Sequence, residues 1–415
     1  MEKKHKEDIM KIFLMDIIEP SRGGSPTIHK LELIRNLSGL GHEIHIITSE
    51  DINIDAVHVH PFKNKKRQGF WGLLYQLRHV MRLLKLIRTH HFDILCTRNI
   101  SIGILGYITR KRGTKLVFEM NGISPFERKQ NQLKEEGFIK SRIENIRIAW
   151  LKYIELFFAK RADAIIAVTE EIKKYLVNHR IEEDKIKVIE NGANTELFRP
   201  IKDKEILNEL KNKLSINNDE NVVIYAGGLN PWQGIEYLIR AAPFVIKENP
   251  KTKFLIVGGG KDQLQEKENL ISLCKALDRE NNVMFTGMVH YEDVSKYINI
   301  SNICVTPFIK GRVCSPLKLF EFLSCGKPVV SSDIAGVREI LNNSKGGILV
   351  TPENPEELAK QIIRLLKDKE LQERMGRAGR QYVIQNHSWE ITARKTVKVF
   401  VIIHVLETSR HKHHF

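Results

Sequence analysis

Short apolar runs alternate with helix-length amphipathic segments along nearly the whole chain. Many runs are continuously apolar, as in residues 164–168, which is typical of parallel strands buried on both faces. The runs predict strands at 11–17, 43–48, 57–60, 93–97, 115–119, 164–168, 185–189, 221–226, 253–257, 282–286, 303–306, 328–331 and 347–350. The segments between them predict helices at 27–40, 72–90, 139–162, 235–247, 261–278, 316–324, 355–367 and 369–386.

This order of elements predicts an α/β protein in which right-handed crossovers join parallel strands into doubly wound sheets. Thirteen strands are too many for one ordinary sheet of this kind, so a domain boundary is needed. Residues 197–220 provide it, because Leu197-Phe198-Arg199-Pro200 is followed by a polar, lysine-rich segment. We expect Rossmann-like domains at 1–198 and 199–385, a C-terminal helix at 386–405 and a basic tail at 406–415.

Composition narrows the class of protein. Of 415 residues, 42% are hydrophobic and 28% charged, which excludes extensive disorder, and the 26 glycines and 13 prolines follow no period. No stretch approaches about 18 uncharged apolar residues, so no membrane-spanning helix is predicted. The charged residues 1–8 do not resemble a secretory signal, and a cytoplasmic location is expected. Five cysteines without a Cys-x-x-Cys motif are interpreted as reduced core thiols rather than metal ligands.

The positive charge is unevenly distributed. Residues 51–150 hold 19 Lys and Arg against 8 Asp and Glu, a net +11 of the total +16. This predicts a basic face on one domain, and anionic lipid, a phosphate-bearing substrate or nucleic acid would each fit it. The chain has no recognisable nucleic-acid recognition module, so we expect no nucleic-acid partner.

Residues 63–88 carry much of this charge. A basic run, Lys63-Asn64-Lys65-Lys66-Arg67, precedes a helix with an apolar stripe at 70, 73, 74, 77, 80, 81, 84 and 87. One interpretation is a crossover helix packed on the first sheet with a solvated basic face. The other is peripheral contact with anionic lipid at the inner membrane face, with Phe70, Trp71 and Leu74 in the headgroup layer.

Two segments could bind an anion through a helix N-terminus. Gly23 and Gly24 follow the first strand and open a helix, although the same pair would also suit a plain strand-to-helix turn. In the second segment, Ser315 is expected as the N-cap and Pro316 as the first helical residue.

Lys318 and Glu321 share one face of this second helix. Amides near Leu317 and Lys318 would then face a phosphate, and Glu321 a sugar diol. The alternative is an ordinary surface ion pair on a capped helix.

Several segments, in order, are similar to those of one known family. Tyr225–Ile239, Phe254–Gly260, Val283–Gly287 and the helix after Ser315 resemble the C-terminal domain of family-four retaining glycosyltransferases. In the N-terminal half, Gly23–Thr27, Gly41–Ile44, Ala162–Val168 and Ile189–Asn194 match corresponding segments.

The resemblance covers about residues 11–400, within a subgroup that has Ser-Pro-x-Lys and Trp-Gln-Gly segments. It implies the GT-B architecture, with two Rossmann-like domains facing a cleft and a last helix returning to the first domain. It also implies sugar transfer from a nucleotide-sugar donor, UDP- or GDP-linked, to an acceptor hydroxyl without a cofactor or essential metal.

The resemblance also implies roles for individual residues. Glu321 matches the second Glu of the family's Glu-x7-Glu motif and would bind the ribose. Amides of Leu317, Lys318 and Leu319, after Ser315 and Pro316, would bind the diphosphate, and Met288 and Val289 would contact the base. Gly227 lies in the glycine-containing loop of the same domain.

The sequence departs from the family pattern at several positions. The family's diphosphate-binding Arg and Lys fall at Gly228 and Gln233, the first motif Glu at Val313, and a His of the first domain at Asn121. We hypothesise that Lys318 replaces part of the missing positive charge, with Arg312 and Lys310 as weaker candidates. Asn121, Glu119 and Gly24 are the candidates on the acceptor side.

The expected function is therefore transfer of a hexosyl or N-acetylhexosaminyl group to a lipid-linked or saccharide acceptor in cell-envelope polysaccharide, lipopolysaccharide or glycolipid synthesis. A nucleotide-sugar epimerase of the same architecture, a non-enzymatic protein that binds anionic surfaces, and an inactive transferase remain alternatives. His42, His45, His58 and His60 are expected at strand ends. His411, His413 and His414 lie in the basic tail, and no metal is assigned to them.

Overall fold

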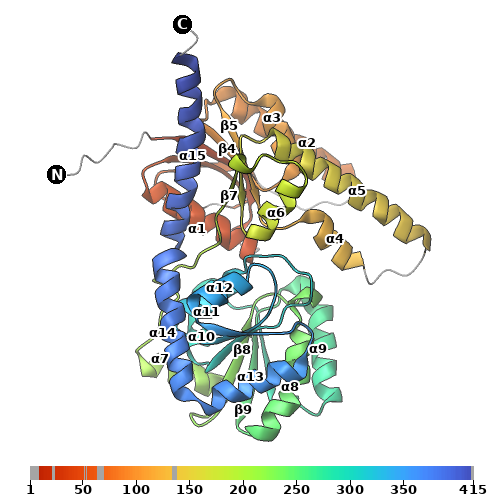
Figure 1. Ribbon diagram of the computed structural model, residues 1–415, viewed down its shortest axis with the longest axis vertical. Coiled ribbons are helices and arrows are strands. Elements are labelled where there is room, and N and C mark those ends of the chain that lie inside the picture. The colour runs from red at the N-terminus through yellow and green to blue at the C-terminus, as the bar shows by residue number, and fades with distance from the viewer. Residues whose placement is uncertain are drawn as a thin grey trace, which may run out of the picture. The chain divides into compact units, whose positions relative to one another are not determined.

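The computed structural model describes residues 9–20, 24–50, 52, 54–62, 70–132 and 138–412. These residues form two compact units, each built on one parallel sheet with helices on both faces (Figure 1). The first unit contains the residues up to Glu190 and those from Thr392 on, and the second contains Asn191–Ile391. All thirteen predicted strands are present within a residue or two of their predicted bounds.

The first sheet has seven parallel strands in the order β3-β2-β1-β4-β5-β6-β7. These are β3 (Val57–Pro61), β2 (Glu43–Thr48), β1 (Lys11–Ile18), β4 (Ile94–Thr97), β5 (Lys115–Met120), β6 (Ala164–Ala167) and β7 (Ile186–Val188). Strands β4, β5 and β6 are nearly fully buried, and β6 is continuously apolar, as expected for strands covered on both faces.

Two layers of helices cover this sheet. Leu33, Ile34 and Leu37 of α1 (Ser25–Gly39) join the core on one face, together with Ala393 and Phe400 of α15 (Trp389–Lys412). The other helices of the unit are α2 (Phe70–Thr89), α3 (Ile100–Thr109), α4 (Ser124–Gln132), α5 (Phe138–Arg161) and α6 (Glu170–Asn178), with the 3-10 turn η2 (Glu183–Lys185).

Helix α3 is built for close packing. A Cβ at Gly103 would lie 2.0 Å from the Phe158 ring of α5, and one at Gly106 would lie 2.9 Å from Met15 of β1. Glycine at both positions therefore lets the helix approach its neighbours more closely than any other residue would allow.

The second sheet has six parallel strands in the order β10-β9-β8-β11-β12-β13. These are β10 (Val283–Gly287), β9 (Thr252–Val257), β8 (Asn221–Ala226), β11 (Ile303–Thr306), β12 (Val329–Ser332) and β13 (Gly347–Val350). The strand order reverses between β8 and β11, and in sheets of this type ligands bind beyond the carboxyl ends of the strands at such a reversal.

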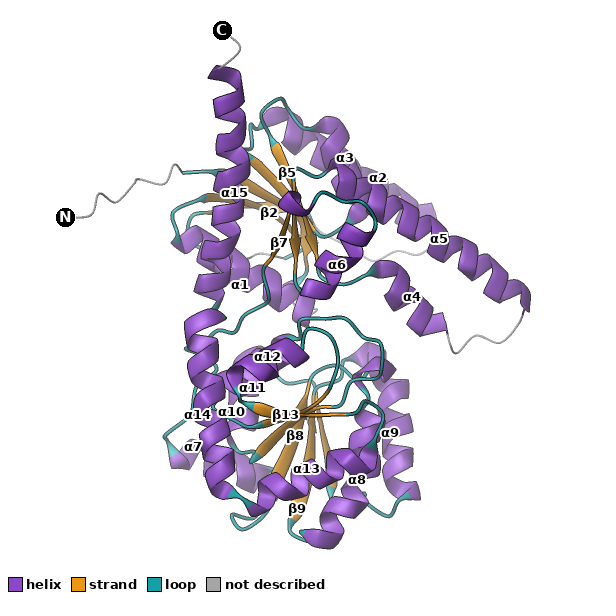
Figure 2. Cartoon of the chain, in the orientation of Figure 1, coloured by secondary structure: helices purple, strands orange, loops and turns teal. Residues whose placement is uncertain are grey.

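Helices cover both faces of the second sheet as well (Figure 2). One core contains residues of α10 (Tyr291–Asn299), α11 (Leu317–Ser324), α12 (Arg338–Ser344) and α14 (Lys369–Asn386), and α7 (Lys204–Lys213) packs partly against it. The opposite core contains residues of α8 (Ile235–Glu248), α9 (Leu264–Ala276) and α13 (Pro355–Lys367). The 3-10 turns η3 (Pro231–Gln233) and η4 (Lys261–Gln263) lie in loops after strands.

The division between the units falls eight residues before the expected one. Ala193 and Phe198 are buried in the core of the second unit, and the Phe198 carbonyl accepts a hydrogen bond from Ser324 of α11. Helix α15 starts in the second unit and continues in the first from Thr392 on. Its backbone is helical as far as Lys412, so much of the expected tail is helix. Within the described residues, none of the helices has the length and apolar character needed to cross a bilayer.

Candidate functional site

The second unit brings two sequence-distant loops together at the carboxyl edge of its sheet. The loop after β8 contains Gly227, Gly228 and Gln233, and the loop after β11 leads to α11. These two strands are the pair at which the strand order reverses. The predicted anion-binding helix therefore starts at the position where this class of sheet binds its ligands.

Helix α11 begins one residue later than predicted, and Ser315 is not its N-cap. Pro316 occupies that position, with extended backbone and no side-chain capping bond. The Ser315 hydroxyl instead accepts from the backbone amide of Asn191, 3.2 Å away, and the Ser315 carbonyl accepts from the Asn191 side chain at 2.6 Å. Because no side chain caps the helix, the first-turn amides of Leu317 and Lys318 point out of its start, as an anion site requires.

Lys318 is the best-defined charged residue of the site. Its Nζ donates to the Tyr225 hydroxyl at 2.8 Å and to Gln233 Oε1 at 2.9 Å. The ammonium also lies 4.1 Å from the centre of the Tyr225 ring, and the Tyr225 hydroxyl donates a hydrogen bond to the Gly228 carbonyl. Only 8% of Lys318 is exposed, so this is a buried cation held by neutral groups rather than the surface ion pair considered from sequence.

Burial controls the protonation of Lys318. Desolvation lowers the pKa of its ammonium to about 7, and the nearby Cys314 and Glu321 only partly oppose this effect. A lysine amine has three N–H donors, of which Tyr225 and Gln233 take two. One donor is left for a ligand, and an anion arriving there would favour the charged form of the amine.

Two features require glycine at position 227: its backbone conformation and the nearby amine of Lys318. Its φ of +143° lies in the region that favours glycine, and a Cβ there would lie 2.5 Å from Lys318 Nζ. The neighbouring Gly228 supplies the carbonyl for Tyr225. Gly227 thus has the specific role of admitting the lysine amine.

The remaining predicted residues of this unit lie around the same edge. Glu321 is buried one turn after Lys318 on α11, close enough to affect the pKa of the lysine. Met288, 63% exposed, and the half-buried Val289 follow β10. Leu319 is fully buried, and its amide bonds to the Pro316 carbonyl, so the prediction that this amide is offered to a ligand is wrong.

The weaker cation candidates lie in the loop before α11. The Arg312 guanidinium stacks 4.1 Å from the centre of the Trp232 ring, and Trp232 adjoins Gln233. Lys310 is exposed, and its backbone amide donates to Glu353. Val313, at the position of the first motif Glu, pairs with Ala335 through an isolated bridge and offers no charge.

The first unit holds a separate polar cluster at the carboxyl ends of β1, β4 and β5. Asn121 donates to Glu119 Oε1 at 2.7 Å, and His29 Nε2 and Arg98 Nε lie 3.3 and 3.7 Å from the same oxygen. Asp16 accepts from the Arg98 amide at 3.0 Å and lies 3.7 Å from Lys30 Nζ. A small cavity beside the cluster is lined by Leu14, Asp16, Ile18, Lys30, Leu33, Cys96, Arg98 and Glu119.

Hydrogen bonding fixes the protonation pattern of this cluster. Arg98 can only donate, so its 3.2 Å contact with His29 Nδ1 leaves the histidine proton on Nε2, facing Glu119. Burial lowers the pKa of His29 to about 4, so the ring is neutral at pH 7. Although burial opposes it, the surrounding His29, Arg98 and Asn121 lower the pKa of Glu119. Glu119 is thus an ionised anchor for Asn121 and a poor general base.

The predicted glycine pair at the start of α1 is only partly described. Gly24 is the N-cap of α1 with φ +81°, and its carbonyl accepts from Thr27 and Ile28. Gly23 lies outside the described residues, so the predicted anion site there stays a prediction.

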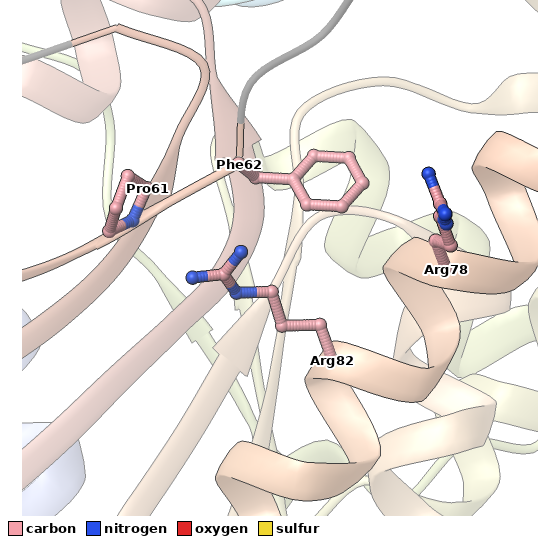
Figure 3. Close-up of a pocket in the computed structure, with 4 residues that line it drawn as sticks. All are labelled: Pro61, Phe62, Arg78 and Arg82. Carbon is pink, nitrogen blue, oxygen red and sulfur yellow. The ribbon is translucent and has the colours of Figure 1, made fainter.

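The basic segment 63–88 is described only from the start of α2, and its side chains from Arg78 on. Leu83 and Ile87 are buried, whereas Met81 is 65% exposed, so its predicted place in the packed stripe is wrong. Arg78 and Arg82, one turn apart, line a hollow with Phe62 and Pro61 (Figure 3).

Sequence reasoning missed several residues of both sites. Tyr225 was read only as part of a family segment, and Asp16, Lys30 and Arg98 carried no local signal. Their partners lie up to 93 residues away in sequence, as Lys318 and Tyr225 illustrate. The positions of polar residues just after buried strands were the one usable signal, because those positions share an edge of the sheet.

Two parallel sheets, with an open helix start and a buried cation at the strand reversal of one of them, are features common among nucleotide-binding α/β proteins. Comparison with known families agrees. Residues 27–197 match Glycosyltransferase Family 4, and residues 207–382 match Glycosyl transferases group 1. The chain belongs to the family-four glycosyltransferases, as the sequence resemblance implied.

Individual relatives are distant. An uncharacterized glycosyltransferase of Methanocaldococcus jannaschii is 26% identical over 95% of this chain and 98% of its own. The UDP-Gal:alpha-D-GlcNAc-diphosphoundecaprenol alpha-1,3-galactosyltransferase of Escherichia coli is 25% identical over 72% of this chain and 73% of its own.

Solved structures confirm the fold class. Anabaena HepE in complex with UDP and glucose superposes with a TM-score of 0.71 at 20% identity, covering 94% of this chain and 99% of that one. Sucrose-phosphate synthase from Thermosynechococcus elongatus gives a TM-score of 0.76 at 19% identity, covering 95% and 99%. The fold is GT-B, with two Rossmann-like α/β domains.

Proposed function

We propose that this protein is a retaining, metal-independent glycosyltransferase whose second unit holds a UDP-sugar. The observation that carries the proposal is Lys318, a buried cation at the open start of α11 with one donor left for a ligand. The diphosphate would contact the amides of Leu317 and Lys318 and the Lys318 ammonium, and Glu321 would bind the ribose.

Relatives support the choice of donor and acceptor. HepE was solved with UDP and glucose, and the Escherichia coli relative is named for transfer from UDP-galactose to a diphosphoundecaprenol-linked sugar. A UDP-linked hexose or N-acetylhexosamine is therefore the proposed donor, with Met288 and Val289 beside the base. A lipid-linked sugar, used in cell-envelope glycan synthesis, is the proposed acceptor.

The chemistry follows from the groups present. Retention without an assigned carboxylate nucleophile implies attack of the acceptor hydroxyl on the face from which the diphosphate leaves. The bond between the anomeric carbon and the diphosphate oxygen breaks, and the acceptor oxygen bonds to that carbon. The hydroxyl proton passes to a departing β-phosphate oxygen. The protein stabilises the charge that develops on the diphosphate through the α11 amides and Lys318.

Asn121 is the proposed acceptor-side residue of the first unit. Its side-chain NH₂ donates to Glu119, which leaves the amide carbonyl oxygen available to accept a hydrogen bond from the acceptor hydroxyl. We therefore expect Asn121→Ala to lower the transfer rate more than the affinity for the donor. Measuring kcat and the donor Kd of both proteins separates the two effects.

Incubation with UDP-, GDP- and ADP-sugars, followed by NMR of the product, tests this function. We expect transfer from a UDP-sugar to a sugar acceptor linked to undecaprenyl diphosphate, with the α-configuration of the donor kept and the rate unchanged by a chelator. An inverted product or a chelator-sensitive rate would contradict retention or metal independence. Interconversion of free donor without transfer would indicate an epimerase.

Donor binding should take up a proton at Lys318. With a pKa of about 7 in the free protein, the amine is about half protonated at pH 7, and a diphosphate favours its charged form. Affinity for a UDP-sugar, whose diphosphate does not titrate near neutral pH, should therefore fall by up to about tenfold per pH unit above 7. Calorimetry in buffers of different ionisation enthalpy measures the proton uptake on donor binding. The same uptake in Lys318→Met would show that Lys318 is not the group that takes up the proton.

We also propose that the basic face of α2 contacts anionic membrane lipid. Arg78, Arg82, Lys85 and Arg88 are exposed on the helix, and Met81 is exposed among them. The protein should sediment with phosphatidylglycerol vesicles at low salt and be released by high salt. The double variant Arg78→Glu, Arg82→Glu should remain in the supernatant, whereas equal sedimentation of both proteins would contradict this surface.

A further inference from the structure

Three potential metal ligands share one face of the first sheet, away from the residues of the proposed function. Glu43 and His45 are two apart on β2, so their side chains point to the same side. The parallel pairing of β2 with the edge strand β3 places His58 directly beside His45. The prediction that His45 and His58 lie at strand ends is wrong, because both lie within paired strands.

The side-chain atoms of this trio already converge. Glu43 Oε1 lies 2.8 Å from His45 Nε2 and 3.5 Å from His58 Nε2, and the three ligand atoms all fall within 4.8 Å of one another. The two imidazole rings are stacked, with centres 4.5 Å apart and planes 18° apart. Both rings therefore present the same nitrogen to one carboxylate.

We propose that Glu43, His45 and His58 bind a divalent transition-metal ion such as Zn²⁺. Bonds of about 2.0–2.1 Å in tetrahedral geometry place neighbouring ligand atoms roughly 3.3 Å apart. The Glu43–His58 distance of 3.5 Å nearly matches this value, and the Glu43–His45 contact needs to open by only about half an ångström. Two imidazoles and a carboxylate form a donor set that zinc commonly takes, with the fourth position left to water.

The surroundings suit such a site. The side chains of His58 and Glu43 are 57% and 36% exposed, so an ion can enter from solvent, whereas His45 is buried and rigidly packed. His45 Nδ1 lies 2.9 Å from His60 Nε2, a contact that would let His45 bind a metal through Nε2 while Nδ1–H donates to His60. Hydrogen bonding of the second nitrogen is the usual way in which metal-bound histidines are oriented.

Lys11 provides an internal competitor for the metal. Its Nζ lies 2.6 Å from Glu43 Oε1, the same oxygen that faces both histidines. A bound ion would have to displace this ammonium or use the second carboxylate oxygen. Removing the lysine charge should therefore strengthen metal binding, an effect that a purely structural histidine stack would not produce.

The test is titration of the full chain, freed of metal, with Zn²⁺ by calorimetry, and with Co²⁺ by visible absorption, about one pH unit above the ordinary histidine pKa. We expect His58→Ala and Glu43→Gln each to weaken one binding event about tenfold or more. Lys11→Met should tighten the same event at least about threefold. His91→Ala, which removes an exposed histidine outside the trio, is the matched control and should leave it unchanged.

The chain has 16 histidines, so the difference between variants decides the outcome rather than binding alone. Loss of a tetrahedral Co²⁺ spectrum in His58→Ala, with the spectrum kept in His91→Ala, would support the site. Equal affinity and stoichiometry in wild type and His58→Ala, no binding in the wild type, or weaker binding in Lys11→Met would overturn it. The site lies outside the residues proposed for sugar transfer, so a failure of one proposal leaves the other testable.

Discussion

Lys318→Met should abolish most sugar transfer while making the protein more stable. Among the described residues, Lys318 is the buried cation at the start of α11. Without it the departing diphosphate is less stabilised, and we expect kcat/KM to fall by about 10²–10³-fold. Burying a charge costs several kcal/mol per ion in real proteins, and the uncharged methionine relieves this cost at position 318, so we expect a gain of about 1–4 kcal/mol. Transfer assays and thermal melting measure the two effects.

The gain in stability should depend on pH. The folded-state pKa of about 7 lies below the ordinary 10.5, so the unfolded chain binds a proton between these values that the folded chain does not. The free-energy cost of burying the charged amine, which methionine removes, is therefore largest below about pH 7 and disappears toward pH 10.5. Lys360→Met, on the exposed face of α13, is the control. A Lys318→Met protein of wild-type activity would contradict the role of this residue.

Glu321→Gln should weaken donor binding by about 10- to 100-fold. An ionised carboxylate accepts stronger hydrogen bonds from ribose hydroxyls than an amide does, and the amide also presents donors where acceptors are needed. Glutamine has the same shape, so the buried position on α11 should tolerate it. Titration with UDP and with a UDP-sugar measures the loss.

The matched control for this change is Glu356→Gln, an exposed carboxylate in the first turn of α13. We expect its donor affinity to equal that of the wild type. Unchanged affinity in Glu321→Gln as well would show that Glu321 does not bind the ribose. A lower melting temperature with unchanged affinity would instead assign it to packing against Lys318.

Most of the fold could be predicted because the central strands of both sheets are buried on both faces. Continuous apolar runs such as 164–168 are typical of strands inside a parallel sheet, and the helices between them predict right-handed crossovers. Helix α3 was harder to predict, since Gly103 and Gly106 weaken its helical signal. Their purpose, close approach to Phe158 and Met15, depends on residues that are remote in sequence.

The candidate site was predicted only in outline. Local pattern placed Lys318 and Glu321 on one helix, and the family resemblance suggested a ligand. The partners of Lys318 could not be inferred, because Tyr225 and Gln233 lie 93 and 85 residues away and meet it only through the strand order. Ser315 was misassigned because a capping serine and a serine bound to Asn191 look alike in sequence.

A crystal structure of the full chain with UDP tests the central claim most directly. We expect diphosphate oxygens within about 3 Å of the Leu317 and Lys318 amides and of Lys318 Nζ, with the ribose hydroxyls on Glu321. UDP bound away from the start of α11, or bound there with Lys318 still turned only toward Tyr225 and Gln233, would contradict the account.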